Sequence, residues 1–219
     1  RQIYVLGKED VDTDEFDASV IAHEWGHYYQ SAFSRDDSIG GGHSVDDLLD
    51  RRLAFSEGWG NAWSGIALGR SNYVDSKLPQ QRGGGTLDLS SGPANNPGWF
   101  RESSVQAILW NLNRQAGFKP IHDTLTGFQF RSGAPVTSIH AFAAAFKAVS
   151  PGNGSALTSL LSGQGIISSD AFGVGESNSG GVPSALPMYE SLAVGAAARN
   201  VCITNAAGTG NKHGNNAYL

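Results

Sequence analysis

Apolar residues fill the stretch from residue 18 to residue 33 and leave almost no polar face. They are Val20, Ile21, Ala22, Trp25, Tyr28, Tyr29, Ala32 and Phe33. This pattern predicts a helix that is central and buried. Asp17 is a suitable N-cap, and Asp14 and Glu15 lie where the positive end of the helix dipole favours acidic groups.

A second apolar stretch predicts a long helix from about Ser44, which can cap it, to Leu68, with Gly69 ending it. Its large residues are Leu48, Leu49, Leu53, Phe55, Trp59, Trp63 and Ile66. Small residues stand between them, namely Gly58, Gly60, Ala62 and Gly65. Glycine inside a helix costs about 1 kcal/mol relative to alanine. We therefore expect another backbone to pack closely against this helix.

The rest of the pattern predicts an α+β fold, mainly helical with a small N-terminal sheet. Residues 3–6 have the composition of a short strand that a glycine stops. Residues 71–100 are polar and rich in glycine and proline, which predicts a long loop of the kind that is often functional. Further helices are expected at about 102–115 and 138–150, with a short helical stretch near 157–161.

The character of the sequence changes near its C-terminal end. Residues 198–204 have strand composition and residues 205–216 are turn-forming. We therefore assign residues 1–195 to one domain and residues 196–219 to the start of a β-rich module. Because the chain begins with arginine rather than methionine, we interpret it as part of a longer precursor, with the first domain incomplete on its N-terminal side.

Composition narrows the classes of function. Hydrophobic residues make up 40% of the 219 residues and aromatic residues 10%, which is enough for a folded core. The formal net charge of -5 gives no cationic surface for nucleic acid. No run approaches the roughly 18 apolar residues of a membrane span. The single cysteine, Cys202, excludes an internal disulfide.

The first predicted helix carries an H-E-x-x-H motif, formed by His23, Glu24 and His27. At 100° per residue, His27 lies about 40° around the helix from His23, and Glu24 lies about 60° beyond His27. All three side chains therefore point into one arc. Two imidazoles one turn apart can bind one zinc ion, and Glu24 can reach a water beside the metal as the catalytic base. A metal also offsets the cost of burying these polar groups on an apolar helix.

A catalytic zinc site needs a third protein ligand. The extended motif with a third histidine requires glycine at position 30 and histidine at position 33, but these positions are Gln30 and Phe33. The remaining candidates are His43, Asp36, Asp37, Asp46, Asp47 and Glu57. We select Glu57, because large aromatic neighbours on the same helix predict its burial, where a lone carboxylate needs a cation. His43 and the aspartates belong to or adjoin a glycine-rich loop and are expected to be solvated or capping residues.

Two stretches of the sequence resemble the gluzincins, the thermolysin-like zinc peptidases. They are residues 18–27, preceded by the expected strand at 3–6, and residues 55–61, Phe-Ser-Glu-Gly-Trp-Gly-Asn. The resemblance implies a zincin-like fold with an edge strand before the active-site helix, and a zinc site completed by Glu57. It further implies hydrolysis of peptide bonds in a peptide or protein substrate, by a secreted and bacterial enzyme.

Two features depart from the thermolysin pattern. Where thermolysin has an aspartate that orients a zinc histidine, this chain has Asn61, which can accept an imidazole N–H but brings no charge. The histidine that steadies the oxyanion in thermolysin has no counterpart in residues 99–103. Arg101, His122, His140 or a tyrosine are the candidates for its role.

Other interpretations stay open from the sequence. Asp10, Asp12 and Asp14 resemble the start of a calcium loop, but Glu15 and Ile21 stand where an EF-hand needs Gly and Glu. A looser structural calcium site and helix capping both fit these acids. A zinc amidase that acts on cell-wall peptides would share the same chemistry, and a binding or adhesion module with a zinc-stabilised fold is a different class. The sequence leaves the oligomeric state undetermined.

Overall fold

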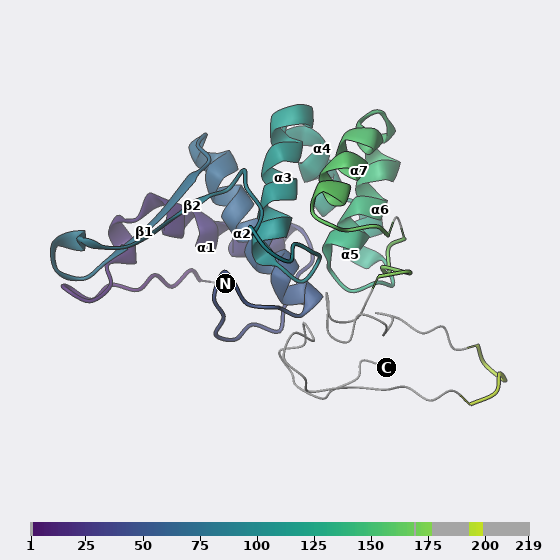
Figure 1. The fold of residues 1–219 in the computed structure, drawn as a ribbon, viewed down its shortest axis with the longest axis horizontal. Coiled ribbons are helices and arrows are strands. Elements are labelled where there is room, and N and C mark those ends of the chain that lie inside the picture. The colour runs from purple at the N-terminus through teal and green to yellow at the C-terminus, as the bar shows by residue number, and fades with distance from the viewer. Residues whose placement is uncertain (1, 169, 177–192, 199–219) are drawn as a thin grey trace.

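The computed structural model describes residues 2–168, 170–176 and 193–198 (Figure 1). Within these ranges the protein is α+β. About half of it is helical, and one small two-stranded antiparallel sheet accompanies the helices. The predicted fold class is therefore confirmed at this level. No helix in the described ranges is long and apolar enough to cross a membrane.

Three long helices form the centre of the molecule: α1 (Ala18–Phe33), α2 (Arg51–Leu68) and α3 (Glu102–Ala116). Helix α2 packs against both of the others (Figure 1). Trp59 on α2 is fully buried and donates its indole N–H to the carbonyl oxygen of Gly26 on α1 at 2.9 Å. This bond fixes the two helices against each other near the H-E-x-x-H motif.

Glycines on α2 allow the three backbones to approach one another. A Cβ atom added to Gly60 would lie 2.8 Å from the His23 ring on α1. One added to Gly58 would lie 2.5 Å from the Val105 side chain and 2.8 Å from the carbonyl oxygen of Glu102 on α3. No side chain fits at such distances, so the expectation of close packing against this helix is confirmed.

The predicted bounds of α1 are confirmed, but its burial is not complete. Val20 and Tyr29 are buried, whereas large side chains elsewhere around the helix are 40–48% exposed: Ile21, Trp25 and Phe33. Asp17 occupies the N-cap position without a side-chain cap bond. Its carboxylate instead accepts hydrogen bonds from the backbone N–H and hydroxyl of Ser76, at 2.7 and 2.8 Å. The start of α1 is thereby tied to the sheet.

Helix α2 begins at Arg51 rather than just after Ser44. Asp50 caps it, because its carboxylate accepts the backbone N–H of Arg52 at 2.9 Å. Ser44 and Asp47 form a separate turn, in which each backbone N–H is bonded within the turn, at 3.0 and 2.9 Å. The predicted C-terminal end is confirmed, with a glycine in the left-handed conformation directly after the last helical residue.

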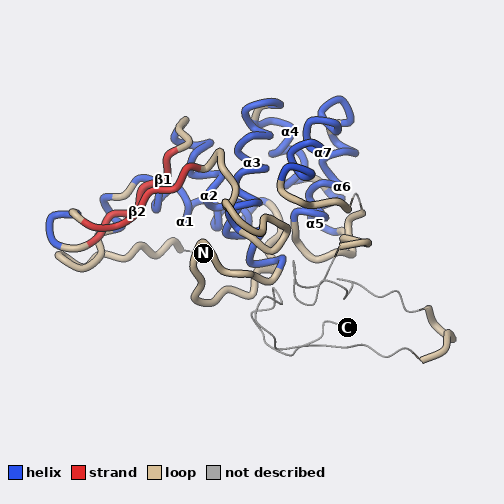
Figure 2. The backbone as a smooth tube through the Cα atoms, viewed as in Figure 1, coloured by secondary structure: helices blue, strands red, loops and turns tan. Residues whose placement is uncertain are grey.

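The sheet is a hairpin of β1 (Asn72–Lys77) and β2 (Gly83–Asp88), joined by a short 3-10 turn at Pro79–Gln81 (Figure 2). It lies within the stretch predicted as a loop. The predicted strand at 3–6 is wrong: residues 2–7 form no strand, and Ile3, Tyr4 and Leu6 are exposed. An extended segment becomes a strand only beside a partner, and among the described residues β1 pairs with β2 instead.

The second half of the described chain is helical, with α4 (Phe118–Thr126), α5 (Phe128–Ser132), α6 (Ile139–Val149) and α7 (Gly154–Gly163). A 3-10 turn at Pro151–Asn153 lies between α6 and α7, and another at Asp14–Phe16 precedes α1. Of the five helices from α3 to α7, three were predicted, namely α3, α6 and α7, while α4 and α5 were missed because they are short and separated by glycine. They complete a core that contains Phe55, Phe142 and Phe146 and extends from α2 to α7.

The expected strand at 198–204 and the module at 196–219 lie outside the described residues, apart from 196–198, so the division into domains stays a prediction. Before that point, Glu176 connects residues 167–168 to His140 on α6. The buried Glu176 carboxylate lies 3.3 Å from His140 Nε2 and accepts the backbone N–H groups of Ile167 and Ser168 at 2.8 Å.

Candidate metal centre

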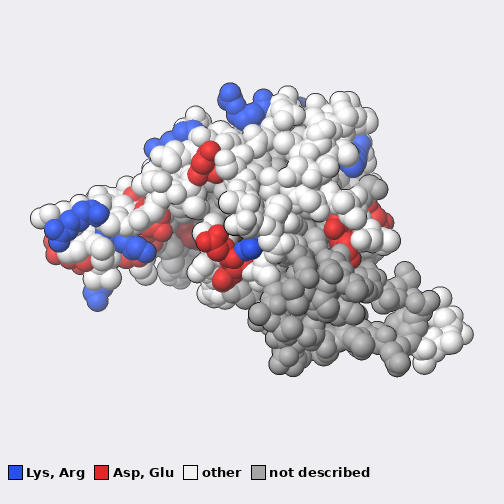
Figure 3. Space-filling view, in the orientation of Figure 1, with Lys and Arg blue, Asp and Glu red and all other residues white. Residues whose placement is uncertain are grey.

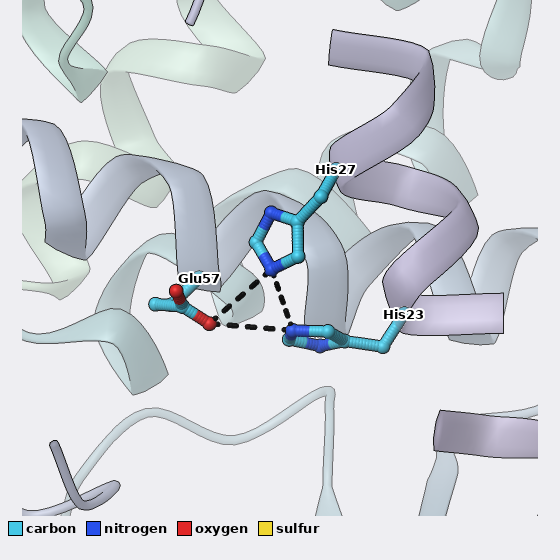
Figure 4. A group of neighbouring side chains, drawn as sticks. All are labelled: His23, His27 and Glu57. Carbon is cyan, nitrogen blue, oxygen red and sulfur yellow. Dashed lines mark hydrogen bonds and ion pairs between the residues drawn. The ribbon is translucent and has the colours of Figure 1, made fainter. Parts of the chain in front are cut away.

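Three predicted ligands converge where α1 meets α2 (Figure 4). His23 Nε2 and His27 Nε2 are 2.9 Å apart, and Glu57 Oε2 lies 3.2 Å from the first and 3.4 Å from the second. Two ligand atoms that each lie 2.0–2.1 Å from a tetrahedral zinc ion are about 3.3 Å from each other. The three atoms therefore form a group whose spacing suits one metal ion.

The outer nitrogen of each imidazole is already engaged. His23 Nδ1 lies 2.9 Å from the side-chain oxygen of Asn61, and His27 Nδ1 lies 3.2 Å from the hydroxyl oxygen of Ser56. Because an amide oxygen only accepts, Nδ1 of His23 carries the proton and donates it, and Ser56 can accept in the same way. Both Nε2 atoms then face the Glu57 carboxylate. When the two imidazoles are neutral they present lone pairs here, and three electron-rich atoms at this spacing repel one another unless a metal ion or a proton lies between them.

The electrostatics of the group favour a cation. Burial alone would raise the pKa of Glu57, but hydrogen bonds from His23, His27 and His43 hold the pKa of its carboxyl well below the usual range. Burial would lower the pKa of His27, yet its hydrogen bond with Glu57 and the charge of that carboxylate outweigh burial and raise this pKa. The predicted burial of Glu57 is confirmed, since its side chain is 13% exposed.

Glu24 lies one residue after His23 on α1 and is partly buried. Its charge acts on both His27 and Tyr73. Within the described part of the chain its carboxylate forms no hydrogen bond or ion pair, so no protein cation holds it. The structure thus leaves Glu24 beside the ligand group with its oxygens available, as a base requires.

His43 and Glu102 extend the site beyond the selected ligands. His43 Nε2 lies 3.4 Å from Glu57 Oε2 and 3.3 Å from Glu102 Oε2. His43 is exposed, as expected of a residue in this loop, but its imidazole also contacts two carboxylates of the site, which the sequence did not indicate. Glu102 escaped sequence reasoning, because an acid in the first turn of a helix ordinarily indicates a favourable dipole contact at the surface. Its side chain is only 6% exposed, and burial raises its pKa.

The four aspartates considered as ligands fix the loop between α1 and α2. Asp37 pairs with Arg35 at 2.9 Å and accepts the backbone N–H of Thr137 at 2.9 Å. The other three also form hydrogen bonds with nearby groups. The carboxylates of Asp36 and Asp47 accept backbone N–H groups within the loop, and the carbonyl oxygen of Asp46 accepts a hydrogen bond from the Arg101 side chain. None of them belongs to the His23–His27–Glu57 group.

Three of the residues considered for oxyanion stabilisation form hydrogen bonds or ion pairs with groups outside the candidate metal centre. The Arg101 guanidinium donates to the carbonyl oxygens of Asn96 and Asp46, His122 Nδ1 lies 2.6 Å from the Tyr29 hydroxyl, and His140 pairs with Glu176. None of the three bonds to a predicted ligand among the described residues. Of the tyrosines, Tyr73 on β1 has its ring 6.1 Å from the His23 ring.

A separate acidic cluster lies at the hairpin, where Figure 3 shows charged side chains of both signs. Carboxylate oxygens of Asp12, Asp14 and Asp75 lie within 4.8 Å of one another, and Asp10 is not part of the group. Two of the three acids of the expected calcium loop are therefore brought together, with a third from β1. A structural calcium ion stays a prediction, and these are the carboxylates that would bind it.

The acidic cluster makes stability depend on pH. Partial burial and the charge of Asp12 raise the pKa of Asp14 from 3.8 to about 6. A group with a raised folded-state pKa stabilises the fold fully below pH 3.8 and loses that contribution as pH rises through 6. We expect Asp14→Asn to raise the free energy of unfolding by about 0.2–1 kcal/mol at pH 7, after solvent screening, and by less at pH 4. Urea titrations at both values measure this.

The control for this prediction is Asp10→Asn, which removes a neighbouring exposed acid outside the cluster. An equal increase in the free energy of unfolding of both variants at pH 7 would contradict a specific role of Asp14. An increase for Asp14→Asn that is as large at pH 4 as at pH 7 would contradict it as well.

The described structure is thus an α+β protein with a candidate metal centre between its first two long helices. Comparison of the chain with models of known protein families, with curated proteins and with solved structures found no match.

Proposed function

We propose that the protein is a zinc-dependent peptidase that hydrolyses peptide bonds. The observation that carries this proposal is the convergence of His23 Nε2, His27 Nε2 and Glu57 Oε2 within 3.4 Å of one another, with both Nδ1 atoms bonded away from the centre. Two imidazoles and one carboxylate are a ligand set of catalytic zinc sites, which keep a fourth position open.

Each residue has a distinct role in the proposed reaction. His23, His27 and Glu57 would hold the zinc ion, and Asn61 and Ser56 would keep the two imidazoles in the binding tautomer. When bound, zinc polarises the carbonyl group and makes water more acidic. Glu24 takes a proton from the attacking water and passes it to the leaving amine. Its uncommitted carboxylate, next to a ligand on the same helix, supports this role.

The resemblance to the gluzincins supports the same proposal. The H-E-x-x-H motif lies on one helix and the glutamate ligand on the next, as in that family, and the two helices bring them together here. We accordingly propose a zincin-like catalytic domain of a secreted enzyme. Asn61 accepts the His23 N–H as expected, so the missing aspartate does not remove the orienting bond.

The test combines metal analysis with hydrolysis. We expect the purified protein to bind one zinc ion and to release soluble peptides from casein. A chelator should abolish the release, and added zinc should restore it. Absence of zinc binding would overturn the metal site itself. Tight zinc binding with no hydrolysis of casein or of a peptide library would overturn the proposed peptidase activity and favour a zinc-stabilised binding module. Hydrolysis of cell-wall peptides alone would favour an amidase.

A further inference from the structure

A loop that follows α7 is joined at its two ends by one carboxylate. The loop comprises residues 167–168 and 170–176 (the Glu176 loop). Glu176 Oε1 accepts the backbone N–H groups of Ile167 and Ser168, each at 2.8 Å. The side chain at the end of the loop therefore holds the backbone at its start.

The same carboxylate attaches the loop to α6. Glu176 Oε1 lies 3.3 Å from His140 Nε2, and because a carboxylate oxygen only accepts, the imidazole donates. Glu176 is 7% exposed and His140 is 1% exposed. A buried carboxylate is costly unless donors satisfy it, and here three N–H groups converge on one oxygen. His140 Nδ1 forms no hydrogen bond with the described residues, so the imidazole contacts the loop through Nε2.

Apolar burial fixes the loop chiefly where it begins. Ile166, directly before it, is 2% exposed and belongs to the core that extends from α2 to α7. Beyond this anchor, large apolar side chains are exposed: Ile167 by 76%, Phe172 by 37% and Val174 by 62%. Arg51 on α2 donates to the carbonyl oxygen of Phe172 at a long distance of 3.5 Å. A segment with few buried apolar contacts opens at a low cost in free energy.

The loop forms one wall of an apolar cavity of about 210 Å³, to which it contributes Ala171. The other walls come from α5, α6 and the connection between them, and include Phe130, Pro135, Ala141, Ala144 and Ala145. His140 directly precedes the first of the α6 alanines. The contact of Glu176 with His140 therefore holds the loop beside this cavity.

We propose that the Glu176 loop is an acid-sensitive lid of this cavity. While the Glu176 carboxylate is ionised, it accepts two backbone N–H groups and pairs with His140, which keeps the lid closed. Protonation of the carboxyl by the solvent removes the charge that these donors share, and the loop then opens about its anchor at Ile166. Opening withdraws Ala171 and exposes the apolar side chains of α5 and α6.

The sign of the pH effect follows from the surroundings of the carboxyl. Burial would raise the pKa of Glu176, but the hydrogen bonds from His140, Ser168 and Ile167 and the charge of His140 outweigh burial and lower this pKa. A group with a lowered pKa in the closed state stabilises that state fully above its ordinary value of 4.5. The contribution is lost as pH falls through the lowered value, by up to about tenfold in the closing equilibrium for each pH unit.

Other charged groups lie on the neighbouring elements, namely Arg51 on α2, Arg131 on α5, Lys147 on α6 and Asp170 in the loop. Arg51 and the exposed Asp170 both bond to the backbone of Phe172, through its C=O and its N–H. His140 is the charged group that pairs with Glu176. The acid response is therefore assigned to Glu176 and not to Asp170.

The experiment measures hydrogen exchange of the Ile167 and Ser168 amides, corrected for the intrinsic effect of pH and referred to amides of α3. We expect their protection to fall by about tenfold between pH 7 and pH 3.5, while α3 stays protected. Glu176→Gln should lower their protection at pH 7 by about 10–100-fold, because a neutral acceptor forms weaker bonds, and should remove the acid response. Binding of the dye anilinonaphthalene sulfonate should rise when the lid opens.

Asp170→Asn is the matched control, because it neutralises an exposed acid of the same loop. Its protection should stay within about threefold of the wild-type value at both pH values. The proposal is overturned if the wild-type amides keep their protection at pH 3.5, if Glu176→Gln responds to acid as the wild type does, or if Asp170→Asn loses the response. Loss of protection without added dye binding overturns the role as a lid. The experiment uses neither zinc nor casein, so its outcome is independent of the proposed peptidase activity.

Discussion

Glu24→Gln is expected to lower the rate of casein hydrolysis by about 10²–10⁴-fold and to leave zinc binding intact. Glutamine has nearly the same shape as glutamate but cannot take a proton from water. The Glu24 carboxylate forms no hydrogen bond or ion pair with the described residues, so its replacement breaks no contact that shapes the ligand group. Zinc stoichiometry and affinity, measured beside the rate, separate a lost base from a lost metal.

A matched control for this prediction is Glu9→Gln, which neutralises an exposed glutamate away from the helix. Its rate should equal that of the wild-type chain. If Glu24→Gln hydrolyses casein at the full rate, the mechanism through this carboxylate is wrong, even if the metal site is right. If it loses zinc as well, Glu24 supports the site structurally and the assignment of a base has no support.

The ligand group was predictable because it depends on local geometry. Helical periodicity alone places His23 and His27 on one face, and the aromatic neighbours of Glu57 indicate a buried carboxylate. His43 was a candidate that the same reasoning set aside. The contact of His43 with the candidate metal centre depends on two loop glycines and on Glu102, which lies on a helix about sixty residues later in the chain. No periodic pattern in the sequence predicts such a contact. Contacts made by loops over long sequence separations are set by the tertiary fold.

In the fold, too, features that depend on local sequence were predictable and features that depend on distant partners were not. The bounds of α1 and the end of α2 follow from apolar periodicity and a terminal glycine, which are local signals. The strand expected at 3–6 fails because β-structure requires a partner, and composition does not say whether one is present. Conversely, β2 contains Gly83, Gly84 and Gly85, which have low strand propensity, yet it pairs in register with β1. Pairing with a neighbour outweighed intrinsic preference.

The small residues of α2 were the sequence feature that best anticipated the tertiary structure. Glycine weakens an isolated helix, so several of them in one helix indicate that packing requires the space. Gly60 gives the clearest case, because it faces the ring of a predicted metal ligand. The same position therefore matters both for close helix contact and for the candidate metal site.

Gly60→Ala is accordingly expected to reduce zinc affinity by about 10–100-fold. The added Cβ would lie 2.8–2.9 Å from three atoms of the His23 ring, so the ring must shift, which disturbs its contacts with Asn61 and His27. Overpacking of this kind costs about 1–3 kcal/mol, and the better helix propensity of alanine returns about 1 kcal/mol. The free energy of unfolding of the apo protein should therefore fall only modestly, while zinc binding falls severely.

Gly163→Ala provides the matched control, because it also replaces a helical glycine but its added Cβ would meet no atom within 4 Å. We expect its stability to be equal to or up to about 1 kcal/mol above that of the wild-type chain, with zinc affinity unchanged. Chelator competition and urea unfolding of both variants give the comparison. If Gly60→Ala binds zinc as tightly as Gly163→Ala does, then His23 is either free to repack or not a ligand, and the close contact between α1 and α2 does not define the metal centre.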